Sequence, residues 1–422
     1  MKSQLRQKKD ASYIYKLNKI NVLNLIREST EISRATIVKK TNLSAPTVTR
    51  IVASLIDDKF VTMVGEGDST GGRPPKLVRF VGNHNFVIGV DVGSTSLRAG
   101  IANLHGDILT EIETPTMLTG GFDVIIQQVG RLINKLIDRS KLERHKILGV
   151  GLAVAGLINK GNGHVAYSPV FDWTNVDLEK ELSKTIDFPI FHDNVSRVTA
   201  LGELLYGIGK RYKNFISVNA GFGIGAGIII DGDRYFGSKG FTGELGHIVL
   251  DRESRYVGKD GIKGCLEALS SGYGIAEIAK IRLTEESDTE SLILSLVNGN
   301  IEDLSAKEVI DAAKMGDPLA TEIFEDAMHF FAIGLDVLIK LFNPSAIVMS
   351  GGLTRSGTIF FEKLTEYLGL SSMLPVENKI ELLPSSFQDD ATLMGAFSLV
   401  ISKVLMFENS VTPEKKLLEK LS

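Results

Sequence analysis

A glycine-dense segment in the middle of the chain is followed closely by two side chains that could bind a ligand. Residues 219–230 read Asn-Ala-Gly-Phe-Gly-Ile-Gly-Ala-Gly-Ile-Ile-Ile. Glycine tolerates positive φ and lets a backbone approach a ligand, so we expect a hairpin that presents N–H groups to a phosphate or sugar oxygen. Glu244 and His247 follow, three residues apart, and offer an acceptor and a switchable donor to neighbouring hydroxyl groups. The glycines that we expect to provide positive φ and close approach are Gly221, Gly223, Gly225 and Gly227.

The plainer alternative for this segment is an ordinary hairpin with one solvated glutamate and one structural histidine. The residues around it must decide between the two interpretations. We therefore turn to the elements that would position these side chains.

The charge of the chain is divided unevenly along its length. Residues 1–82 contain 15 Lys and Arg against 7 Asp and Glu, whereas the remainder contains 32 against 44. A basic module on an acidic body predicts a polyanionic partner for the module alone. A chance bias in an ordinary soluble domain is the alternative.

Three short helices are predicted in this basic module. Apolar residues recur at helical spacing over 14–28, Ser33 can cap a second helix over 33–40, and a third helix covers 46–56. Two strands, 60–64 and 76–80, should follow. The order is that of a winged helix-turn-helix domain, which places its third helix in the DNA major groove.

The third helix should present a polar face to DNA. Thr and Ser hydroxyls together with an arginine suit contacts with phosphates and base edges. Arg73, in the Gly/Pro-shaped wing between the two strands, could enter a minor groove. A small helical interaction domain is the alternative. The candidate DNA-binding residues are Ser44, Thr47, Thr49, Arg50, Ser54 and Arg73.

The rest of the chain reads as an α/β body with two lobes. Three strands, a helix and a fourth strand follow one another over 86–154, and a second set starts near Phe215. This order resembles the ribonuclease H-like half of the actin and sugar-kinase superfamily, in which ligands lie between two such lobes. We expect a first lobe over 83–195, completed by 385–405, a second lobe with ligand and dimer elements over 196–384, and a C-terminal helix over 406–422.

Several motifs in a fixed order resemble the ROK family (repressors, open reading frames and kinases). They begin with Gly71-Gly-Arg-Pro74 in the wing and Asp91-Val-Gly-Ser-Thr95 after the first body strand. The remaining motifs are Ser168-Pro-Val-Phe-Asp-Trp173, the segment Asp193 to Glu203, Gly243-Glu-Leu-Gly-His247 and Gly264-Cys-Leu-Glu267. Members of this family with a winged helix are mostly sugar-responsive transcription factors.

The resemblance also implies a set of sugar-binding residues. Carboxylates, an amide and an imidazole are the side chains that a polyol needs. The positions that the family pattern assigns to sugar contacts or their surroundings are Asn194, Glu244, His247, Glu267, Gly156 and Asp172.

The catalytic features of the kinases in this family are altered. The kinase pattern places the catalytic aspartate eight residues before the glutamate that is Glu203 in this chain. Val195 occupies that position, and its side chain cannot accept a proton from a sugar hydroxyl. Ser96 stands where the kinases carry lysine in the first turn, and Phe222 replaces a small hydroxyl residue in the hairpin. Asp193 could act as the base only if the register slipped. The pattern predicts a sugar sensor without enzyme activity.

The structural zinc site of the family is predicted to be lost. Two thiolate positions carry Gly258 and Asp260, which leaves His247, Asp260 and Cys265 as a weak three-ligand alternative. We expect no cofactor and a metal-free loop in which hydrogen bonds orient His247.

The composition limits the remaining possibilities. The sequence contains no run of about 18 apolar residues, so we predict no membrane span. Its N-terminus also lacks the apolar core of a secretory signal. The single cysteine excludes an intramolecular disulfide and fits a reducing cytoplasm.

The sequence therefore predicts a cytoplasmic, homodimeric or tetrameric repressor that binds double-stranded operator DNA and responds to a sugar bound between its lobes. An active ATP-dependent sugar kinase with an appended DNA-binding domain is one alternative. Control by a protein partner is the other.

Overall fold

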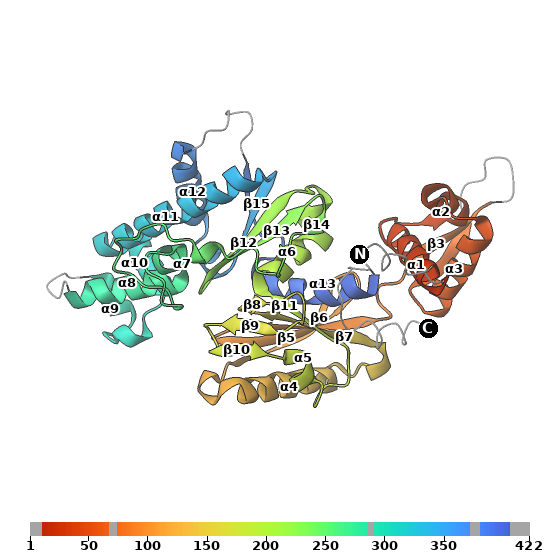
Figure 1. Cartoon of the computed structure of the whole chain (residues 1–422), viewed down its shortest axis with the longest axis horizontal. Helices are drawn as coiled ribbons and strands as arrows, with labels where there is room; N and C mark the ends of the chain where they lie inside the picture. Colours follow the sequence, from red (N-terminus) through yellow and green to blue (C-terminus); the bar gives the residue numbers. More distant parts are fainter. Residues whose placement is uncertain (1–10, 67–73, 286–290, 372–379, 406–422) are drawn as a thin grey trace, which may run out of the picture.

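The computed structural model describes residues 11–66, 74–285, 291–371 and 380–405. Arg73 and the C-terminal helix predicted over 406–422 lie outside these ranges. Figure 1 shows a small N-terminal domain beside a larger body, and two lobes within that body.

The N-terminal domain contains the three predicted helices, α1 (Ala11–Arg27), α2 (Arg34–Thr41) and α3 (Ala45–Asp57). Serine side chains cap the last two: Ser33 accepts from the N–H of Thr36, and Ser44 accepts from the N–H of Thr47. Asn42 adopts φ 56° after α2, which turns the chain into α3 within three residues. The predicted helix-turn-helix is confirmed.

The wing strands β2 (Val61–Glu66) and β3 (Lys76–Phe80) pair antiparallel, as the sequence predicts. A short strand that the sequence analysis missed, β1 (Ile32–Ser33), pairs with the other edge of β3. Val22 of α1 and Phe80 of β3 share an apolar cluster with Val87 and Leu399 of the body, so the N-terminal domain packs against the body.

The first lobe is built on a five-stranded sheet with the order β11-β7-β4-β5-β6. β4, β5 and β6 are antiparallel neighbours, whereas β7 and β11 run parallel to β4. α4 (Gly121–Ser140) packs against β5 and β6. The strands are β4 (Phe86–Val92), β5 (Ser96–Asn103), β6 (Ile108–Pro115), β7 (Ile147–Val154) and β11 (Ile190–Asn194).

The second lobe repeats this topology. Its sheet has the order β14-β13-β12-β15-β16. β12, β13 and β14 are antiparallel neighbours, whereas β15 and β16 run parallel to β12. The duplication confirms the predicted two-lobed α/β body. The strands are β12 (Phe215–Ala220), β13 (Ile224–Ile230), β14 (Asp233–Arg234), β15 (Ala346–Ser350) and β16 (Glu381–Pro384).

Two helices lie between the sheets. α6 (Val195–Leu205) packs on β12 and β13 of the second lobe, whereas α13 (Ala391–Leu405) packs on β4 and β7 of the first. The two helices also pack against each other (Figure 1). α6 is therefore in contact with elements of both lobes.

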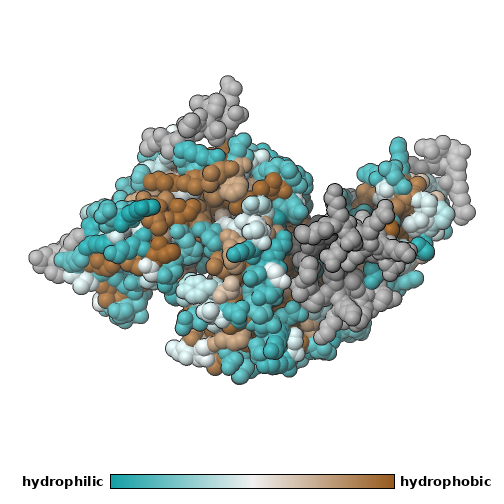
Figure 2. All heavy atoms as spheres, viewed as in Figure 1, coloured by the Kyte–Doolittle hydropathy of each residue, from teal (hydrophilic) through white to brown (hydrophobic). Residues whose placement is uncertain are grey.

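A layer of helices extends the second lobe. Its core is formed by apolar side chains such as Phe324, Phe331 and Phe360. Figure 2 shows hydrophobic residues gathered on the outside of this layer. The side chain of Leu341, for example, is 72% exposed. The helices are α7 (Leu266–Ser270), α8 (Gly272–Glu285), α9 (Leu292–Leu296), α10 (Ala306–Lys314), α11 (Pro318–Phe342) and α12 (Thr358–Ser371).

The first lobe also carries a small three-stranded sheet made of β8 (Leu157–Ile158), β9 (Val165–Ser168) and β10 (Trp173–Val176), followed by α5 (Leu178–Leu182). Within the described part of the chain, no helix is long and apolar enough to cross a bilayer.

Candidate functional site

Asn194 occupies the junction between the first sheet and α6. It is the last residue of β11 and the N-cap of α6, where its Oδ1 accepts from the N–H of Ser196 at 2.9 Å. Its Nδ2 donates to the carbonyl of Gly156 at 2.9 Å. Asparagine suits both tasks because one amide offers an acceptor and two donors. The junction is therefore tied to the turn after β7.

The glycine-rich hairpin differs from the sequence prediction in one respect. None of Gly221, Gly223, Gly225 and Gly227 adopts positive φ. The prediction of left-handed glycines here was wrong because Gly225 and Gly227 lie in an extended strand. Close approach does require them: a Cβ on Gly227 would lie 2.4 Å from the carbonyl of Ser196, and one on Gly225 would lie 2.5 Å from Ser196 Oγ.

The left-handed glycines lie in the following segment instead. Gly240 and Gly243 both have φ 87°, and the carbonyl of Gly243 accepts from the N–H of Ala226 at 2.7 Å. This contact fixes the segment against β13. Glu244 and His247 come next, with Oε2 of the first 3.7 Å from Nε2 of the second.

Glu267 approaches the same place from the first turn of α7. Its Oε2 accepts from the N–H of Ile224 at 3.3 Å. Burial raises the pKa of Glu267, against the opposing charge of His247. Burial likewise raises the pKa of Glu244, which His247 and Arg197 oppose and Glu267 reinforces. Two carboxyl groups and an imidazole thus share one electrostatic environment.

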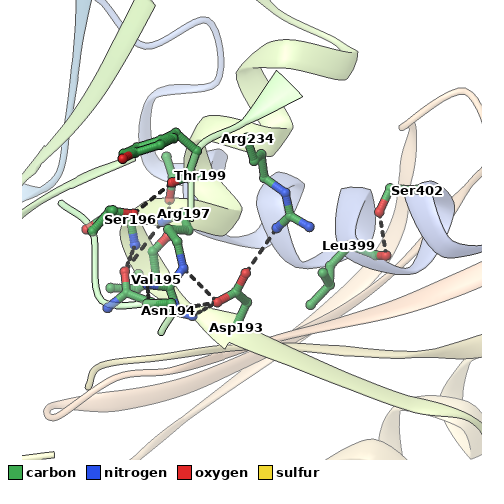
Figure 3. A network of polar contacts seen from close by, with 12 residues as sticks. Asp193, Asn194, Val195, Ser196, Arg197, Thr199, Arg234, Leu399 and Ser402 are labelled. Carbon is green, nitrogen blue, oxygen red and sulfur yellow. Dashed lines mark hydrogen bonds and ion pairs between the residues drawn. The ribbon is translucent and has the colours of Figure 1, made fainter. Parts of the chain in front are cut away.

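A buried ion pair network lies beside Asn194 (Figure 3). Asp193 accepts from Nε of Arg197 at 2.8 Å and from Nη1 of Arg234 at 3.0 Å. Arg197 also donates to the carbonyl of Gly240 at 2.6 Å. The network connects the end of the first sheet with β14 and with the segment that carries Glu244.

The charge state of Asp193 follows from this geometry. Burial alone would raise its pKa, but the positive charges of Arg197 and Arg234 outweigh burial and hold the pKa below its ordinary value. A carboxylate held by two guanidinium groups is a poor proton acceptor.

Comparisons with known proteins agree with this architecture. The sequence model of the ROK family matches residues 87–403, three quarters of the chain. The chain belongs to the ROK family. The match begins at β4, so it covers both lobes and leaves out the N-terminal domain.

Three relatives illustrate the range of this family. The xylose repressor of Caldicellulosiruptor bescii is 29% identical over 93% of this chain and 97% of its own length. The glucokinase of Thermotoga maritima is 30% identical over 75% of this chain and 98% of its own. The crystal structure of a ROK family transcriptional regulator, a homolog of the E. coli MLC protein, has 25% identity and a TM-score of 0.79, and covers 97% of this chain and 99% of its own.

A hydrogen bond closes the turn after Asp91, one of the two positions where the family pattern predicts phosphate contacts in kinases. The N–H of Gly93 donates to the carbonyl of Ser96 at 3.1 Å, so this donor is already used within the turn. Burial raises the pKa of Asp91, just before this turn, to about 7, although the positive charge of Arg98 acts to lower it. The second phosphate-binding position carries Phe222, whose ring lies 5.6 Å from that of Tyr273.

Gly156 and Asp172 both belong to the first lobe. The carbonyl of Gly156 accepts from Asn194, which places this turn at the site. Asp172 is exposed, with φ 54°, in the turn between β9 and β10. Among the described residues, Asp172 makes no hydrogen bond or ion pair with Glu244, His247 or Glu267.

The predicted metal alternative is not supported by the arrangement of its side chains. Among the residues that the structure describes, no group of three or more His, Cys, Asp or Glu could hold a metal ion. Cys265 is buried, and its thiol donates to the carbonyl of Ile262 at 3.5 Å. Nδ1 of His247 lies 2.6 Å from Oδ2 of Asp260.

The predicted DNA-binding residues lie on the outer face and at the start of α3. Ser44, Thr49 and Arg50 are exposed, whereas Thr47 and Ser54 are half-buried. Thr47 and Ser44 contact each other through their hydroxyl groups at 2.8 Å. The guanidinium of Arg50 lies 4.6 Å from the ring centre of Tyr15 on α1, which supports its position.

Sequence analysis missed Tyr206, which contacts the first lobe through its hydroxyl and lies beside Arg27 of the N-terminal domain. Tyr206, the C-cap of α6, donates from its hydroxyl to the carbonyl of Leu104 at 3.0 Å. Burial raises the pKa of Tyr206 to about 12, which the neighbouring Arg27 of α1 opposes. α6 thus begins at Asn194 and ends beside the DNA-binding domain.

This contact borders a cavity of about 1110 Å³ between the DNA-binding domain and the two lobes. Arg27, Tyr206, Asp193 and Arg234 are among its lining residues. None of the six residues predicted to contact a sugar lines it, so it is separate from the Asn194 site.

Proposed function

We propose that the protein is a DNA-binding transcriptional repressor whose affinity for its operator is controlled by a sugar bound between the lobes. The observation that carries this proposal is the extent of the similarity to the xylose repressor. That similarity runs through the N-terminal domain, whereas the similarity to the glucokinase covers a share of this chain that fits the body alone. A winged helix-turn-helix with an exposed polar face on α3 supports the same function.

The proposed sugar contacts are Asn194, Glu244, His247 and Glu267. These side chains come from both lobes, and their carboxylate, amide and imidazole groups suit a neutral polyol. Gly156 orients Asn194 through its carbonyl group, and Asp172 remains a peripheral candidate at the edge of the first lobe. The names of the repressor relatives make D-xylose the first sugar to test.

The proposed control mechanism is a population shift between two lobe arrangements. A sugar that contacts both lobes favours the closed arrangement, and α6 carries the change from Asn194 to Tyr206 and Arg27. In a homodimer, such a change alters the spacing of two winged helices, which must match half-sites about 34–36 Å apart or a multiple of that distance. A coupling free energy of about 1–3 kcal/mol would change operator affinity roughly 5- to 150-fold.

We further propose that the body is not an enzyme. Val195 stands at the position of the kinase base, and the neighbouring Asp193 is held by two arginines. General-base catalysis contributes about 10²- to 10⁴-fold to a rate, so its loss leaves little phosphoryl transfer. The closed Gly93 turn supports the same conclusion.

An operator-release experiment tests the proposal. Duplexes that bind the full-length protein are first selected from a random pool, and their affinity is then measured by fluorescence anisotropy with and without D-xylose, D-glucose and other sugars. We expect one sugar to weaken binding without ATP. A protein that retards no duplex, or that no sugar stabilises in thermal-shift assays, would refute the proposal.

The kinase alternative is favoured by the glucokinase relatives and makes a different prediction. A coupled assay with ATP and each sugar would then show turnover that Asn194→Ala abolishes. Control by a protein partner predicts that a cell extract releases the operator while free sugars do not. Analytical ultracentrifugation tests the proposed dimer against a tetramer.

A further inference from the structure

Nδ1 of His247 and Oδ2 of Asp260 lie so close together that a hydrogen must lie between them. Nδ1 of His247 lies 2.6 Å from Oδ2 of Asp260, and the Asp260 side chain is only 8% exposed. The carboxylate lies off the ideal axis of the ring N–H, and Nδ1 has no aligned hydrogen-bond partner. Two unprotonated lone pairs would repel each other at this separation, so one of the two atoms carries a hydrogen.

A tight loop holds Asp260 in this position. Its Oδ1 accepts from the N–H of Ile262 at 3.0 Å, and the N–H of Gly258 donates to the carbonyl of Ile262 at 2.9 Å. Gly261 provides the turn with φ 84°, and a β-bridge between Val257 and Lys263 closes the loop. The carboxylate is therefore fixed by its own loop before any ligand binds.

The zinc that the family pattern implies does not fit this arrangement. Zinc lies about 2.0–2.2 Å from nitrogen and oxygen ligands in tetrahedral geometry, which keeps two such ligands roughly 3.3 Å apart. The observed 2.6 Å between Nδ1 and Oδ2 leaves no place for a metal between them. Gly258 supplies no ligand, and a Cβ there would lie 2.9 Å from Sγ of Cys265 and 2.8 Å from Oδ1 of Asp260.

We propose that Asp260 is a positioning residue that orients His247 for sugar binding in place of a metal ion. The carboxylate accepts the hydrogen of Nδ1 and fixes the plane of the ring. Nε2 is then the nitrogen directed toward Glu244, 3.7 Å from its Oε2. Removal of the group that orients a metal-bound histidine typically costs about 10- to 100-fold in metal affinity or activity, and we expect an effect of the same order on sugar affinity here.

This inference rests on the proposed sugar site and extends it. The site is complete without metal, so its sugar affinity is the same before and after treatment with a chelator. His247 needs only a neighbouring carboxylate, which the same lobe supplies. The neutral ring carries its hydrogen on Nδ1.

Two substitutions separate orientation from the general structure of the loop. Asp260→Asn keeps one oxygen, which can accept from the N–H of Ile262 or from Nδ1 of His247 but not from both, whereas Asp260→Leu removes both contacts. Asp251→Leu is the matched control, because Oδ1 of Asp251 accepts from the N–H of Glu253 in a similar turn of the same segment. Each full-length variant is titrated by calorimetry with the sugar that wild type binds, starting with D-xylose.

We expect the sugar Kd to rise about tenfold or more in Asp260→Leu. It should stay within about threefold of wild type in Asp251→Leu, which leaves the contact intact, and rise by an intermediate amount in Asp260→Asn, which keeps one of the two contacts. Nitrogen-15 NMR of wild type should show a protonated Nδ1 in His247, and this signal should change in Asp260→Leu. Affinity for the selected operator should be equal in all four proteins.

The results distinguish failure of the inference from failure of the proposed function. Wild type that binds no sugar at all refutes the sugar site. Wild type that binds sugar with an affinity equal to that of Asp260→Leu refutes only the role of Asp260. Stoichiometric zinc in the purified protein, with sugar binding lost on chelation, also refutes this role.

Discussion

Arg197 donates from Nε to Oδ1 of Asp193 at 2.8 Å. Asp193 directly precedes Asn194, whose amide caps α6. The second carboxylate oxygen accepts from Arg234 of β14 at 3.0 Å. Both arginines and the aspartate are buried. This cluster fixes the start of α6 to both lobes, so the position of Asn194 depends on it.

Replacement of Asp193 should destabilise the protein strongly. Asp193→Ala leaves two buried arginines without this partner, and breaking a buried pair costs about 3–5 kcal/mol. The free energy of unfolding, measured in urea, provides the test. Asp233→Ala, at an exposed position in the same region, is the control and should cost about 0.5 kcal/mol or less. Equal stability of the two variants would contradict the role of the cluster.

The stabilising effect of Asp193 should also depend on pH. Its pKa is lowered on folding, so the stabilisation is fully present above the ordinary aspartate pKa and is lost as pH falls through the folded value. The difference in unfolding free energy between wild type and Asp193→Ala should therefore shrink in acid. A difference that stays constant down to the acid transition would refute this linkage.

Asp91 should have the opposite pH dependence. Burial raises its pKa to about 7, so the folded protein binds a proton more tightly than the unfolded chain. The protein should lose stability as pH rises from about 4 to 7, because over this range the unfolded chain releases the proton that the folded state still binds. Asp91→Asn should remove that part of the dependence and raise Tm at pH 8. A lower Tm at pH 8 would contradict this account.

Asn194 allows sugar binding to be separated from helix capping. Serine also caps helices well, so Asn194→Ser should keep the cap and lose the hydrogen bond to the carbonyl of Gly156, at a cost of about 1–3 kcal/mol. It lacks the amide that would contact a sugar, and we expect sugar affinity to fall at least tenfold, as for a lost charged or multiple hydrogen bond. Operator affinity without sugar should be unchanged. Calorimetry and anisotropy measure these quantities, and retained sugar affinity would refute the assignment.

Arg50 should contribute to operator binding alone. Loss of an arginine contact with a base costs about 1–3 kcal/mol, so Arg50→Ala should weaken operator binding roughly 5- to 150-fold without affecting sugar binding. Tyr15→Leu is the control, since it removes the ring under the guanidinium but keeps Arg50. If Tyr15→Leu has as large an effect as Arg50→Ala, the arginine acts by packing and not by contact with DNA.

Tyr206 should affect the coupling between the two sites. Tyr206→Phe removes the hydroxyl that donates to Leu104 and lies beside Arg27. We expect both binding reactions to remain but the sugar-induced change in operator affinity to shrink. Because coupling is reciprocal, the operator-induced change in sugar affinity should shrink equally. An unchanged coupling would exclude this route through α6.

Local signals in the sequence predicted much of the fold. Ser33 was predicted to cap the second helix and does so, and Ser44 caps the third helix in the same way. Alternating and continuous apolar runs located the main strands of both lobes. These features depend on neighbours within a few residues, which a single sequence displays.

The remaining features depend on contacts between distant residues. Asp193 and Arg234 are 41 positions apart, and nothing in their local sequence indicates a pair. The same holds for Tyr206 and Leu104, which are separated by 102 positions. The sugar residues predicted from the family pattern remain predictions, although Asn194 and Gly156 are in contact.

The fit between the hairpin and α6 limits how the two lobes can move. A single methyl group on Gly227 would lie 2.5 Å from the Cβ of Ala200, so helix and hairpin have no freedom to slide past each other. α6 is packed as closely on its other side, where a Cβ on Gly395 of α13 would lie 2.4 Å from the carbonyl of Val198. Any displacement of α6 must therefore carry both the hairpin and α13 with it.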